Sequence, residues 1–445
     1  MASTSTGPSC PIIFTTQTAY PLPTQKYLIP TNWKRFQLSQ LVNKALSLSK
    51  PVPFDFLIRG EVLRTSLAEW CAENGVGEEE TLEVEYIESA LPPQKMTDIP
   101  HEDWVSSVSC SIQGYFLTGS YDGILRVFDY SKNVVLSTLA HSAPITSVCT
   151  VSSPDDAVNE GKPYLVATAS QDLSAQLVEV SLPIDLSKQG ESRTLAKLHL
   201  HTAPVTSVAS DHSGSHILTS SWDMLIGLWD TSIPTSDEVP EPLVAERDRK
   251  RRRKLDASEN KSKKKAPKAV LKSHTARVSR VTFGREARPN TVYSCGFDST
   301  VRLWDVENGV CTQTISASEK PFLDLSLTAD GNIVAASSTD RTITLYDVRT
   351  NNSSNISSSL GSLPHPATPS SLALGSTPHH LISGGYDGVV RMWDLRSTKS
   401  AMTSFKTWDG HKKVLSVDWK RGLVGVGGEG GLEVWKATED TRGSQ

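Results

Sequence analysis

A short phrase recurs seven times along this chain and constrains its fold more than any other feature. In each copy an acidic residue is followed, six positions later, by an apolar and usually aromatic residue. The seven pairs are Asp122/Phe128, Asp172/Val178, Asp223/Trp229, Asp298/Trp304, Asp340/Tyr346, Asp387/Trp393 and Glu429/Trp435. Such a pair spans a turn and about five residues of strand, so it predicts the end of a β-hairpin. Because the hairpins return at intervals of about 40 to 75 residues, the sequence indicates the blades of a β-propeller.

A histidine precedes most of the expected inner strands. It occurs in HSAPI (His141), HTAPV (His201), HTARV (His274), HPATP (His365) and HKKVL (His411), with a fainter copy, HEDWV, at His101. These phrases resemble the WD-repeat family over about residues 100–436. The resemblance implies that His, Ser or Thr, the turn Asp and the Trp form a buried hydrogen-bonded set in each blade. Structural roles are therefore predicted for His201, Asp223, Trp229, His274, Asp298, Trp304, Asp387 and Trp393.

The seven repeats predict seven blades over residues 101–436. Only ten mostly polar residues follow Trp435, so the last blade lacks an outer strand of its own. The segment around Leu91–Ile99, within a linker at 91–100, is expected to supply that strand and so remove an open sheet edge. Residues 437–445 are expected to form a C-terminal tail.

The repeated His and Asp residues do not predict an active site. A catalytic pair would not be rebuilt in blade after blade, whereas a buried carboxylate needs hydrogen-bond donors in every blade. The run Gly425–Gly430 formally matches GxGxxG, but no helix is expected after it. No P-loop is present, and no nucleophile stands beside a base. The chain is therefore not expected to be an enzyme.

Residues 11–90 follow a different pattern, and residues 1–10 before them are expected to be disordered. Strands are expected at 11–17, 27–33, 54–58, 62–63 and 82–86, a helix over 35–48 and a short helix over 67–71. This order is that of the ubiquitin-like β-grasp, and LIRGEVLRTSLAEW and EETLEVEY resemble the second half of ubiquitin. No Gly-Gly tail follows, so a docking domain is expected. The chain is thus mainly β: a seven-bladed WD-repeat β-propeller preceded by a ubiquitin-like β-grasp domain (α+β).

Composition excludes some functions and leaves one unusual segment. No run approaches the roughly 20 apolar residues that cross a bilayer, no signal peptide is recognisable, and the six cysteines are scattered. We therefore expect no membrane partner, no metal site in the chain itself, and reduced thiols in the nucleus or cytoplasm. The net charge is −4, yet residues 247–268 hold twelve Lys/Arg against three acids, so the rest of the chain carries −13.

The charged segment belongs to an insert, 231–270, that is expected to be a disordered loop of the propeller. Two basic clusters with a short spacer suit nuclear import by an importin. The residues of this predicted signal are Arg249, Lys250, Arg251, Arg252, Arg253, Lys254, Lys263, Lys264 and Lys265. Direct contact with RNA phosphates is the alternative. The absence of interleaved aromatic residues argues against readout of bases.

The pairing of the two domains resembles the Notchless family and, more closely, a sister family: the WD-repeat subunit of the PeBoW ribosome-assembly complex. VPFDFLIRGEVLRTSL, LPPQ and EDWVSSV carry this resemblance, and seven blades fit it better than the eight of Notchless proteins. It implies a non-enzymatic assembly factor for the large (60S) ribosomal subunit, required for pre-rRNA processing, in the nucleus, both nucleolus and nucleoplasm. The implied partners are a block-of-proliferation-type WD protein, pescadillo, the AAA ATPase midasin and pre-60S particles. A ubiquitin-pathway substrate adaptor is the alternative.

The same resemblance implies one functional acid. In this family the ubiquitin-like domain docks on the Mg-dependent adhesion domain of midasin, and one of its carboxylates completes the coordination of that Mg²⁺, a hard cation that prefers oxygen ligands. The chain would then have no cofactor of its own. Alignment on TLEVEY implies Glu79, with Glu78 and Glu80 as alternatives. A solvated acidic loop without a ligand is the other interpretation.

The propeller offers a second predicted surface. The residue just ahead of the turn acid is aromatic in four blades: Tyr121, Trp222, Phe297 and Tyr386. Aromatic side chains on a loop face are typical anchors for protein partners. The resemblance implies that the ring binds the propeller of the block-of-proliferation protein, and these residues are predicted to contribute. Packing of each ring against the neighbouring blade is the alternative.

Overall fold

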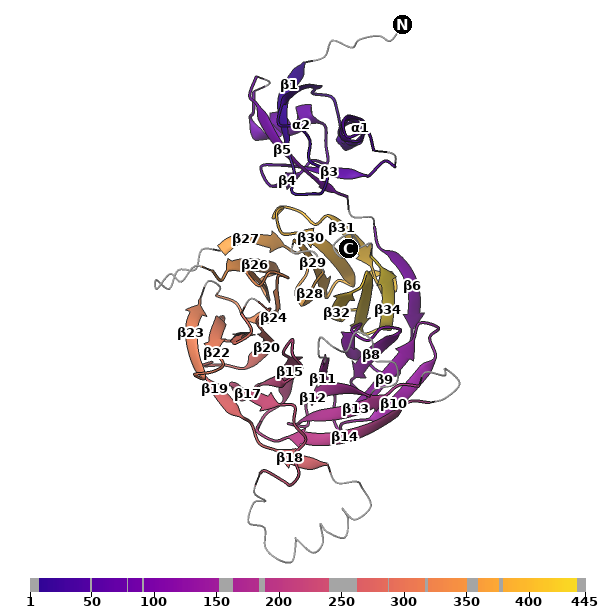
Figure 1. Ribbon diagram of the computed structural model, residues 1–445, viewed down its shortest axis with the longest axis vertical. Coiled ribbons are helices and arrows are strands. Elements are labelled where there is room, and N and C mark those ends of the chain that lie inside the picture. Colours follow the sequence, from indigo (N-terminus) through magenta and orange to yellow (C-terminus); the bar gives the residue numbers. More distant parts are fainter. Residues whose placement is uncertain are drawn as a thin grey trace, which may run out of the picture. The chain divides into compact units, whose positions relative to one another are not determined.

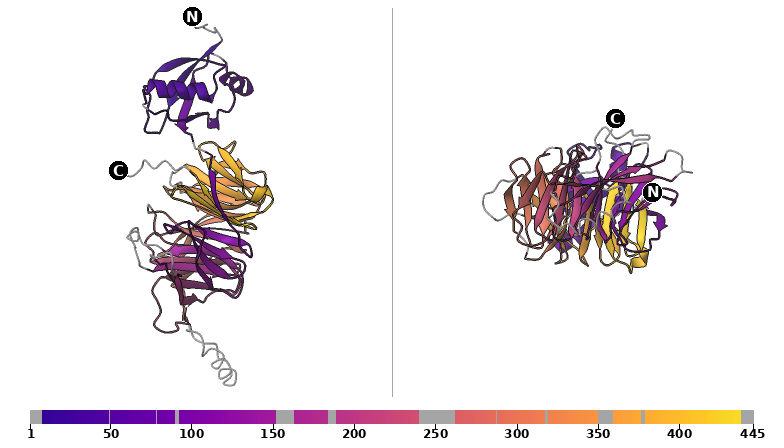
Figure 2. Two further views of the ribbon diagram at one scale, coloured as in Figure 1. Left: turned by 90° about the vertical axis from the view of Figure 1, so that its right-hand side faces the viewer. Right: turned by 90° about the horizontal axis from the view of Figure 1, so that it is seen from below.

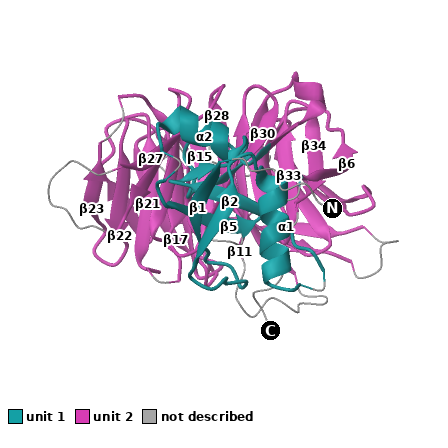
Figure 3. Ribbon diagram, turned by 90° about the horizontal axis from the view of Figure 1, so that it is seen from above, with its two compact units in different colours: residues 1–92, 392–403 teal, residues 93–391, 404–445 magenta. Residues whose placement is uncertain are grey.

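A computed structural model describes residues 8–48, 50–77, 79–89, 92–151, 163–183, 189–239, 262–286, 288–316, 319–349, 359–375 and 379–437. The chain divides into two compact units (Figure 3). One comprises residues 1–92 and 392–403, and the other comprises residues 93–391 and 404–445. Within the described ranges, no helix is both long and apolar enough to cross a bilayer.

The N-terminal unit contains a mixed five-stranded sheet and two helices. Its elements are β1 (Ser9–Thr15), β2 (Lys26–Pro30), α1 (Arg35–Ala45), β3 (Phe54–Ile58), β4 (Glu61–Val62), α2 (Leu67–Asn74) and β5 (Leu82–Glu88). The strand order is β2-β1-β5-β3-β4, with β1 parallel to β5 and the other neighbours antiparallel. The chain order of strands and helices is the one predicted for a β-grasp domain.

The apolar pattern of the sequence explains the core of this unit. α1 buries Leu38 and Val42, which lie one helical turn apart, as expected for an amphipathic helix. The rings of Phe54 and Tyr86 meet edge to face with centroids 5.4 Å apart. The Tyr86 hydroxyl accepts the N–H of Leu22 at 2.9 Å. Burying one such aromatic side chain contributes about 2 kcal/mol.

Two expected boundaries in this unit are wrong. Ser9 and Cys10 do not belong to a disordered N-terminus as expected, because β1 begins at Ser9, opposite Pro30 of β2, and Cys10 is fully buried. Residues 1–7 lie outside the described residues. The helix expected over 35–48 ends at Ala45, because Ser47 has a left-handed φ of 50°, which an α-helix does not continue through.

The second unit is a ring of antiparallel sheets around a central axis (Figures 1 and 2), and each sheet is one blade. Blades 1 and 2 consist of β7 (Val105–Ser109), β8 (Tyr115–Ser120), β9 (Ile124–Asp129), β10 (Val134–Leu139), then β11 (Ile145–Val151), β12 (Tyr164–Ser170), β13 (Ala175–Ser181) and β14 (Glu191–Leu198). Blades 3 and 4 consist of β15 (Val205–Ser210), β16 (His216–Ser221), β17 (Leu225–Asp230), β19 (Ala269–Lys272), then β20 (Val278–Phe283), β21 (Thr291–Gly296), β22 (Val301–Asp305) and β23 (Val310–Ile315).

The remaining blades complete the seven that the repeats predict. Blades 5 and 6 consist of β24 (Phe322–Leu327), β25 (Ile333–Ser338), β26 (Thr342–Asp347), β27 (Ser359–Pro364), then β28 (Pro369–Leu374), β29 (His380–Gly385), β30 (Val389–Asp394) and β31 (Thr403–Lys406). A 3-10 turn, η3 (Trp408–Gly410), leads to blade 7, which consists of β32 (Val414–Lys420), β33 (Leu423–Gly428), β34 (Gly431–Lys436) and β6 (Gln94–Ile99).

The last blade joins the two ends of the ring. β34 pairs antiparallel with β6, with Leu432 opposite Ile99, in the place where the sequence analysis put the ring-closing strand. The fully buried Glu433 accepts a hydrogen bond from Lys95 of β6 at 2.6 Å. Ala437, expected in the C-terminal tail, is instead buried and donates its N–H to Gly422 at 2.9 Å. The closure leaves no open sheet edge between the first and last blades.

The inner strands are joined by a girdle, which we define as the third residue of the innermost strand in each blade. In five blades this residue is Ser, and its hydroxyl accepts a backbone N–H from the next blade, as Ser207 does from Val281 at 3.0 Å. The girdle positions are Ser107, Ser147, Ser207, Arg280, Asp324, Ser371 and Ser416. The backbone N–H donors on the next blades are, in the same order and without a donor for Arg280, Val148, Val208, Val281, Leu372, Val417 and Val108. Arg280 makes no such bond because a guanidinium group has no acceptor atom.

Candidate functional site

The acidic loop lies between α2 and β5 and is fixed at both ends. At the start of α2, Ser66 accepts the N–H of Glu69 while the Glu69 carboxylate accepts the N–H of Ser66, which is a capping box. The helix ends at Gly75 with a left-handed φ of 65°. Beyond the loop, Leu82 of β5 is buried. The loop is therefore held on the surface by ordered elements on either side.

The two described acids of this loop have different surroundings. Glu80 is exposed and forms an ion pair with Arg59, Nη2 to Oε1, at 2.8 Å. Glu79 is also exposed, and no described residue contacts its carboxylate. Glu78 lies outside the described residues. Of the two acids that can be compared, Glu79 offers the carboxylate without a local base, which is the property that coordination to a partner's cation requires.

A metal held by this chain alone has no candidate site in the described ranges, where no group of three or more His, Cys, Asp or Glu is placed to bind an ion. One exposed carboxylate supplies only one or two of the six oxygen ligands that Mg²⁺ takes. An ion bound through Glu79 would therefore have to be held mainly by another molecule and by water.

The four predicted aromatic residues of the propeller share one backbone contact. Each donates its N–H to the residue just ahead of the inner strand of its own blade: Tyr121 to Trp104, Trp222 to Pro204, Phe297 to Arg277 and Tyr386 to Thr368. Because the same loop position carries the same hydrogen bond, these side chains emerge on the same face of the ring. We call Tyr121, Trp222, Phe297 and Tyr386 the aromatic rim.

Exposure divides the aromatic rim into two kinds of residue. Trp222 and Tyr386 keep 46% and 43% of their surface exposed. The Arg277 guanidinium lies 4.1 Å from the Phe297 ring and 5.1 Å from the Trp222 ring, a cation–π arrangement between blades 3 and 4. Tyr121 packs against Trp104 at 5.7 Å. Phe297 and Tyr121 thus contact residues of their own blades, Arg277 and Trp104. Trp222 and Tyr386 each contact a cation of the next blade, Arg277 and Lys413, yet remain accessible.

Sequence reasoning missed further members of this face. Trp104 is 42% exposed, and Met224, next to the turn acid of blade 3, is also 42% exposed. Trp104 could have been found, because it stands in the HEDWV phrase at the position that Arg277 occupies in HTARV. Such clustering of large apolar side chains around one loop face is typical of a protein-binding surface.

The predicted buried sets are present in blades 3 and 4. In blade 3, His201 Nδ1 lies 3.0 Å from Asp223, His201 Nε2 lies 2.8 Å from the Thr219 hydroxyl, and Trp229 Nε1 donates to that hydroxyl at 2.9 Å. Blade 4 repeats the arrangement with His274, Asp298, Ser294 and Trp304, at 2.8, 2.7 and 2.8 Å. The serine and threonine members were not assigned by number from the sequence, since several hydroxyl residues stand close together in each strand.

The acids in these sets are ionised and fully engaged. Burial alone would raise the pKa of Asp172 in blade 2, but hydrogen bonds from His141 and Ser174 outweigh it and lower that pKa to about 2. For Asp223 and Asp298 burial opposes ionisation in the same way, and the histidine partner again lowers the pKa. Asp172 and Asp223 each accept three hydrogen bonds, so these carboxylates are structural anchors rather than general bases.

Blades 1 and 6 replace the His–Asp contact by an Arg–Asp ion pair. Asp122 pairs with Arg126 at 2.7 Å and Asp387 with Arg391 at 2.6 Å. His365 instead directs Nδ1 to the Ala367 carbonyl at 2.6 Å, and its Nε2 faces Arg391 at 3.2 Å. Burial and the Arg391 cation lower the pKa of His365 to about 4, so this histidine is neutral at physiological pH.

The insert departs from the expectation of a disordered loop over 231–270. Residues 231–239 and 262–270 are described, and Lys263–Lys265 form a strand, β18, that pairs parallel with β14 as a fifth strand of blade 2. Lys264 donates its N–H to Asp237 at 2.8 Å, and the N–H of Glu238 returns to the Lys264 carbonyl at 2.9 Å. We call residues 231–238 with 262–266 the clasp.

One predicted import residue is buried in the clasp. Lys265 is 1% exposed, and its ammonium group contacts Asp230 and the Ser232 carbonyl. A buried ammonium group needs such partners, so Lys265 serves the fold and is not accessible to an import receptor in this conformation. Lys263 remains exposed. The predicted cluster from Arg249 to Lys254 lies outside the described residues.

Comparison with known proteins places this geometry in a family. The model described as "NLE (NUC135) domain" matches residues 11–71, and the "WD domain, G-beta repeat" model matches residues 94–129, 192–230, 265–305, 309–347 and 357–394. "Ribosome biogenesis protein YTM1" of Laccaria bicolor is 60% identical over 99% of this chain and 100% of its own length. The chain belongs to the YTM1 family. The resemblance described from the sequence is thereby confirmed at the level of the family.

More distant members of the YTM1 family cover most of the chain as well. The protein of the same name from Coprinopsis cinerea is 58% identical over 96% of this chain, and that from Saccharomyces cerevisiae (strain S288c) is 35% identical over 92% of each chain. This is a family of WD-repeat scaffold proteins and not of enzymes, in agreement with the sequence analysis. The repeat model does not match blades 2 and 7, where Val178 stands for Trp and Glu429 for Asp.

Proposed function

We propose that this protein is an assembly factor for the large ribosomal subunit and acts as a mechanical link. Its propeller joins a complex with a block-of-proliferation-type WD protein and pescadillo on pre-60S particles, and supports pre-rRNA processing. Its N-terminal domain is the handle by which the AAA ATPase midasin removes that complex. The names of the YTM1 relatives, all ribosome biogenesis proteins, support the process, and the division into two units supports the separation of anchor and handle.

The observation that carries the proposal is the exposed carboxylate of Glu79, which has no ion pair with any described residue, beside the paired carboxylate of Glu80. An acid that completes the coordination of a partner's Mg²⁺ must be exposed and free of competing bases. Glu79 satisfies both conditions, and Arg59 holds the neighbouring acid away from the same role. ATP hydrolysis belongs to the partner, and this chain transmits the force through a single ion-bridged contact.

The test compares two neighbouring acids in the full-length protein. Glu79→Ala removes the ligand, whereas Glu80→Ala, the matched control, removes only an exposed ion pair worth less than about 1 kcal/mol. In a pull-down with the adhesion domain of midasin, Glu79→Ala is expected to abolish Mg²⁺-dependent capture and Glu80→Ala to preserve it. Full capture of Glu79→Ala, or equal capture of wild type with and without Mg²⁺, would contradict the proposal.

The aromatic rim is the proposed anchor for the block-of-proliferation-type propeller. Trp222 and Tyr386 are its accessible members, and aromatic side chains at the centre of an interface commonly contribute 2 kcal/mol or more. We expect Trp222→Ala with Tyr386→Ala to weaken copurification at least about tenfold. Lys272→Ala, at an exposed position on the outer strand of blade 3, is the control. Unchanged copurification of the double variant would exclude the rim from the interface.

Nuclear import is proposed to depend on the first basic cluster. Because Lys265 is buried in the clasp, the second cluster offers fewer accessible cations than its sequence suggests, and we take the residues from Arg249 to Lys254 as the main import signal that an importin would bind. Deleting residues 247–254 is expected to leave the protein in the cytoplasm, and a heterologous import signal should restore nuclear entry. Retained nuclear accumulation without the cluster would favour the alternative role, contact with RNA phosphates, which binding to pre-rRNA at increasing salt would measure.

A further inference from the structure

The axial channel of the propeller contains a cationic cavity that the proposed function does not use. The cavity has a volume of about 240 Å³, and inner-strand residues from all seven blades line it. This volume far exceeds the roughly 15 Å³ that a single water requires. The charged side chains in its wall are three cations, Arg280, Arg285 and Lys420, and one carboxylate, Asp418, a formal charge of +2. Outside residues 247–268 the chain as a whole carries −13, so positive charge is concentrated here.

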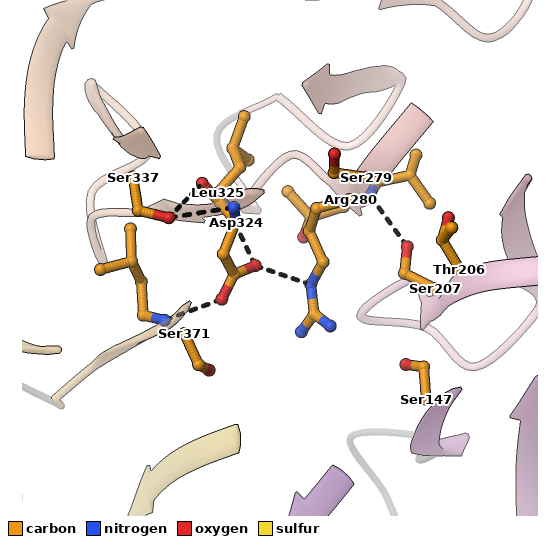
Figure 4. A network of polar contacts seen from close by, with 12 residues as sticks. Ser147, Thr206, Ser207, Ser279, Arg280, Asp324, Leu325, Ser337 and Ser371 are labelled. Atoms are coloured by element: carbon orange, nitrogen blue, oxygen red, sulfur yellow. Dashed lines mark hydrogen bonds and ion pairs between the residues drawn. The ribbon is translucent and has the colours of Figure 1, made fainter. Parts of the chain in front are cut away.

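Arg280 occupies the girdle position at which five other blades carry Ser. Its Nε lies 3.2 Å from Asp324 of the next blade, and Figure 4 shows its two terminal nitrogens pointing away from that carboxylate toward the open centre. Within the described ranges these two nitrogens have no hydrogen-bond partner. Asp324 thus holds the stem of the guanidinium in place, while the donor-rich end faces the channel.

The carboxylates near the cavity are already engaged by backbone donors. Asp324 accepts the N–H of Leu325 at 2.8 Å and of Leu372 at 2.7 Å, and Asp418 accepts the N–H of Cys110 at 2.7 Å. These bonds fix the two carboxylates in place, and Lys420 forms no ion pair with any described residue. Arg280 therefore has a counter-ion in Asp324, whereas Arg285 and Lys420 form no ion pair with a carboxylate among the described residues.

Arg285 stands where the channel opens. It lines the axial cavity and two adjoining depressions of about 660 and 680 Å³, and its Nη2 donates to the Leu327 carbonyl at 3.1 Å. The surrounding protein atoms lower the pKa of its guanidinium, with no carboxylate among the causes. Hydroxyl groups of Ser111, Thr150 and Ser210 line both the cavity and its mouth. The mouth carries the acids Asp211, Glu286 and Asp330 beside Arg285 and Lys420, which line both the mouth and the cavity.

We propose that this cavity is a binding site for a phosphate group, held by Arg280, Arg285 and Lys420 with hydroxyl donors around it. Three cations against the carboxylates Asp418 and Asp324 leave a formal charge of +1, which favours an anion. The several oxygens of a phosphate can accept from two guanidinium groups, an ammonium group and hydroxyls at once, which a carboxylate with two oxygens cannot. The phosphate comes either as the free ion or as part of a small phosphate ester. Because residues from opposite blades would bind it together, the ligand would cross-link the ring.

Isothermal titration calorimetry on the full-length protein tests the site with orthophosphate, glycerol 2-phosphate and acetate at equal ionic strength. We expect saturable binding of at least one of the two phosphate compounds and none of acetate. Binding should also raise the Tm, because a ligand that binds only the folded state stabilises it. Tighter binding of glycerol 2-phosphate would assign the ester as the source, and tighter binding of orthophosphate the free ion. Equal binding of acetate, or no binding of either phosphate, would overturn the proposal.

Three variants connect the binding to the named residues. Arg280→Ser combined with Asp324→Ser rebuilds the girdle as five other blades have it, so it removes the cation without leaving a buried acid unpaired. Arg285→Gln and Lys420→Gln each remove one charge at the solvent side. Each variant is expected to lose at least about tenfold in phosphate affinity, whereas Lys272→Gln, an exposed outer-strand control, keeps wild-type affinity. Should the girdle variant not fold, wild-type affinity in both single variants would still refute the site.

Discussion

The turn carboxylates of blades 3 and 6 occupy equivalent positions, but they accept hydrogen bonds from different residues. In blade 3, Asp223 is bound by a buried histidine that also contacts a strand hydroxyl, His201 to Thr219 at 2.8 Å. In blade 6, Asp387 is bound by Arg391 at 2.6 Å, and the histidine of that blade faces the arginine instead of the acid. The turn geometry is nevertheless preserved, since Leu225 and Val389 each donate their N–H to the respective Asp.

The difference teaches that the turn acid requires donors and not histidine as such. Blade 1 supports this conclusion, because its turn acid Asp122 pairs with Arg126, which occupies the position that Arg391 has in blade 6. A catalytic histidine could not be replaced by arginine in this way, whereas a buried anion is stabilised by any well-placed cation or pair of donors. The two solutions differ in their response to pH and in their tolerance of mutation, and that difference can be measured.

The largest effect is expected from Trp229→Val, which gives blade 3 the residue that blade 2 carries at Val178. Trp229 is fully buried, and its Nε1 donates to Thr219 at 2.9 Å. Losing the ring leaves a cavity and removes one of the hydrogen bonds of the Thr219 hydroxyl, so the free energy of unfolding should fall by about 4 kcal/mol. Urea unfolding followed by tryptophan fluorescence and circular dichroism measures it. Trp222→Val, at a 46% exposed position, is the control and should change stability by less than about 1 kcal/mol.

The second largest effect is a pH dependence of the free energy of unfolding that arises from the histidine of blade 6. The folded pKa of His365 is lowered to about 4 from an ordinary 6.5, so its contribution to stability is complete above pH 6.5 and is lost as the pH falls to about 4. The loss amounts to about 3 kcal/mol. Urea midpoints between pH 7 and 4 measure it, and His365→Gln should flatten that slope. An unchanged slope in the variant would assign the acid sensitivity to another group.

Much of the fold could be predicted from the sequence because its signals are local and repeated. The spacing from turn acid to Trp, such as Asp298 to Trp304, sets a hairpin by itself, and seven copies give the ring. The order of strands and helices in the N-terminal unit followed from apolar periodicity in the same way. Ring closure through β6 could be expected because few residues follow Trp435, although its register with β34 depends on cross-strand packing that a single sequence does not display.

The remaining features depend on contacts between residues far apart in the chain. Lys265 has the sequence context of a basic import signal, yet the parallel pairing of β18 with β14 buries it beside Asp230. In the sequence Arg280 is an ordinary strand residue, and only the fold places Asp324 of the neighbouring blade beside it. Local patterns carry no information on either contact. For Glu79, the sequence supplied the loop and three candidate acids, and only the ion pair of Glu80 with Arg59 distinguishes the two described members.

The third effect concerns the His–Asp blades at acid pH. The pKa of Asp172 is lowered from 3.8 to about 2, so the stability that its ionised form contributes is present above about pH 4 and is lost as the pH falls to about 2. Asp172→Asn should therefore lower the free energy of unfolding by about 2 kcal/mol at pH 7. The difference from wild type should shrink toward pH 2, as measured by urea unfolding at each pH. A constant difference over that range would mean that the charge of Asp172 is not what stabilises blade 2.

The smallest effect compares the two Arg–Asp blades with each other. Arg126 contacts Asp122 and donates to the Ser120 hydroxyl at 2.8 Å, so Arg126→Gln, which retains a donor, should cost only about 1 kcal/mol. Arg391 also faces His365, and in Arg391→Gln the glutamine leaves Asp387 without a cation beside a neutral histidine. The Arg391 variant should therefore lose about twice as much, and loss of the cation should raise the pKa of His365, which NMR titration of the imidazole protons measures. Equal losses in the two variants, with the His365 titration unmoved, would show that the histidine of blade 6 is a bystander to the ion pair.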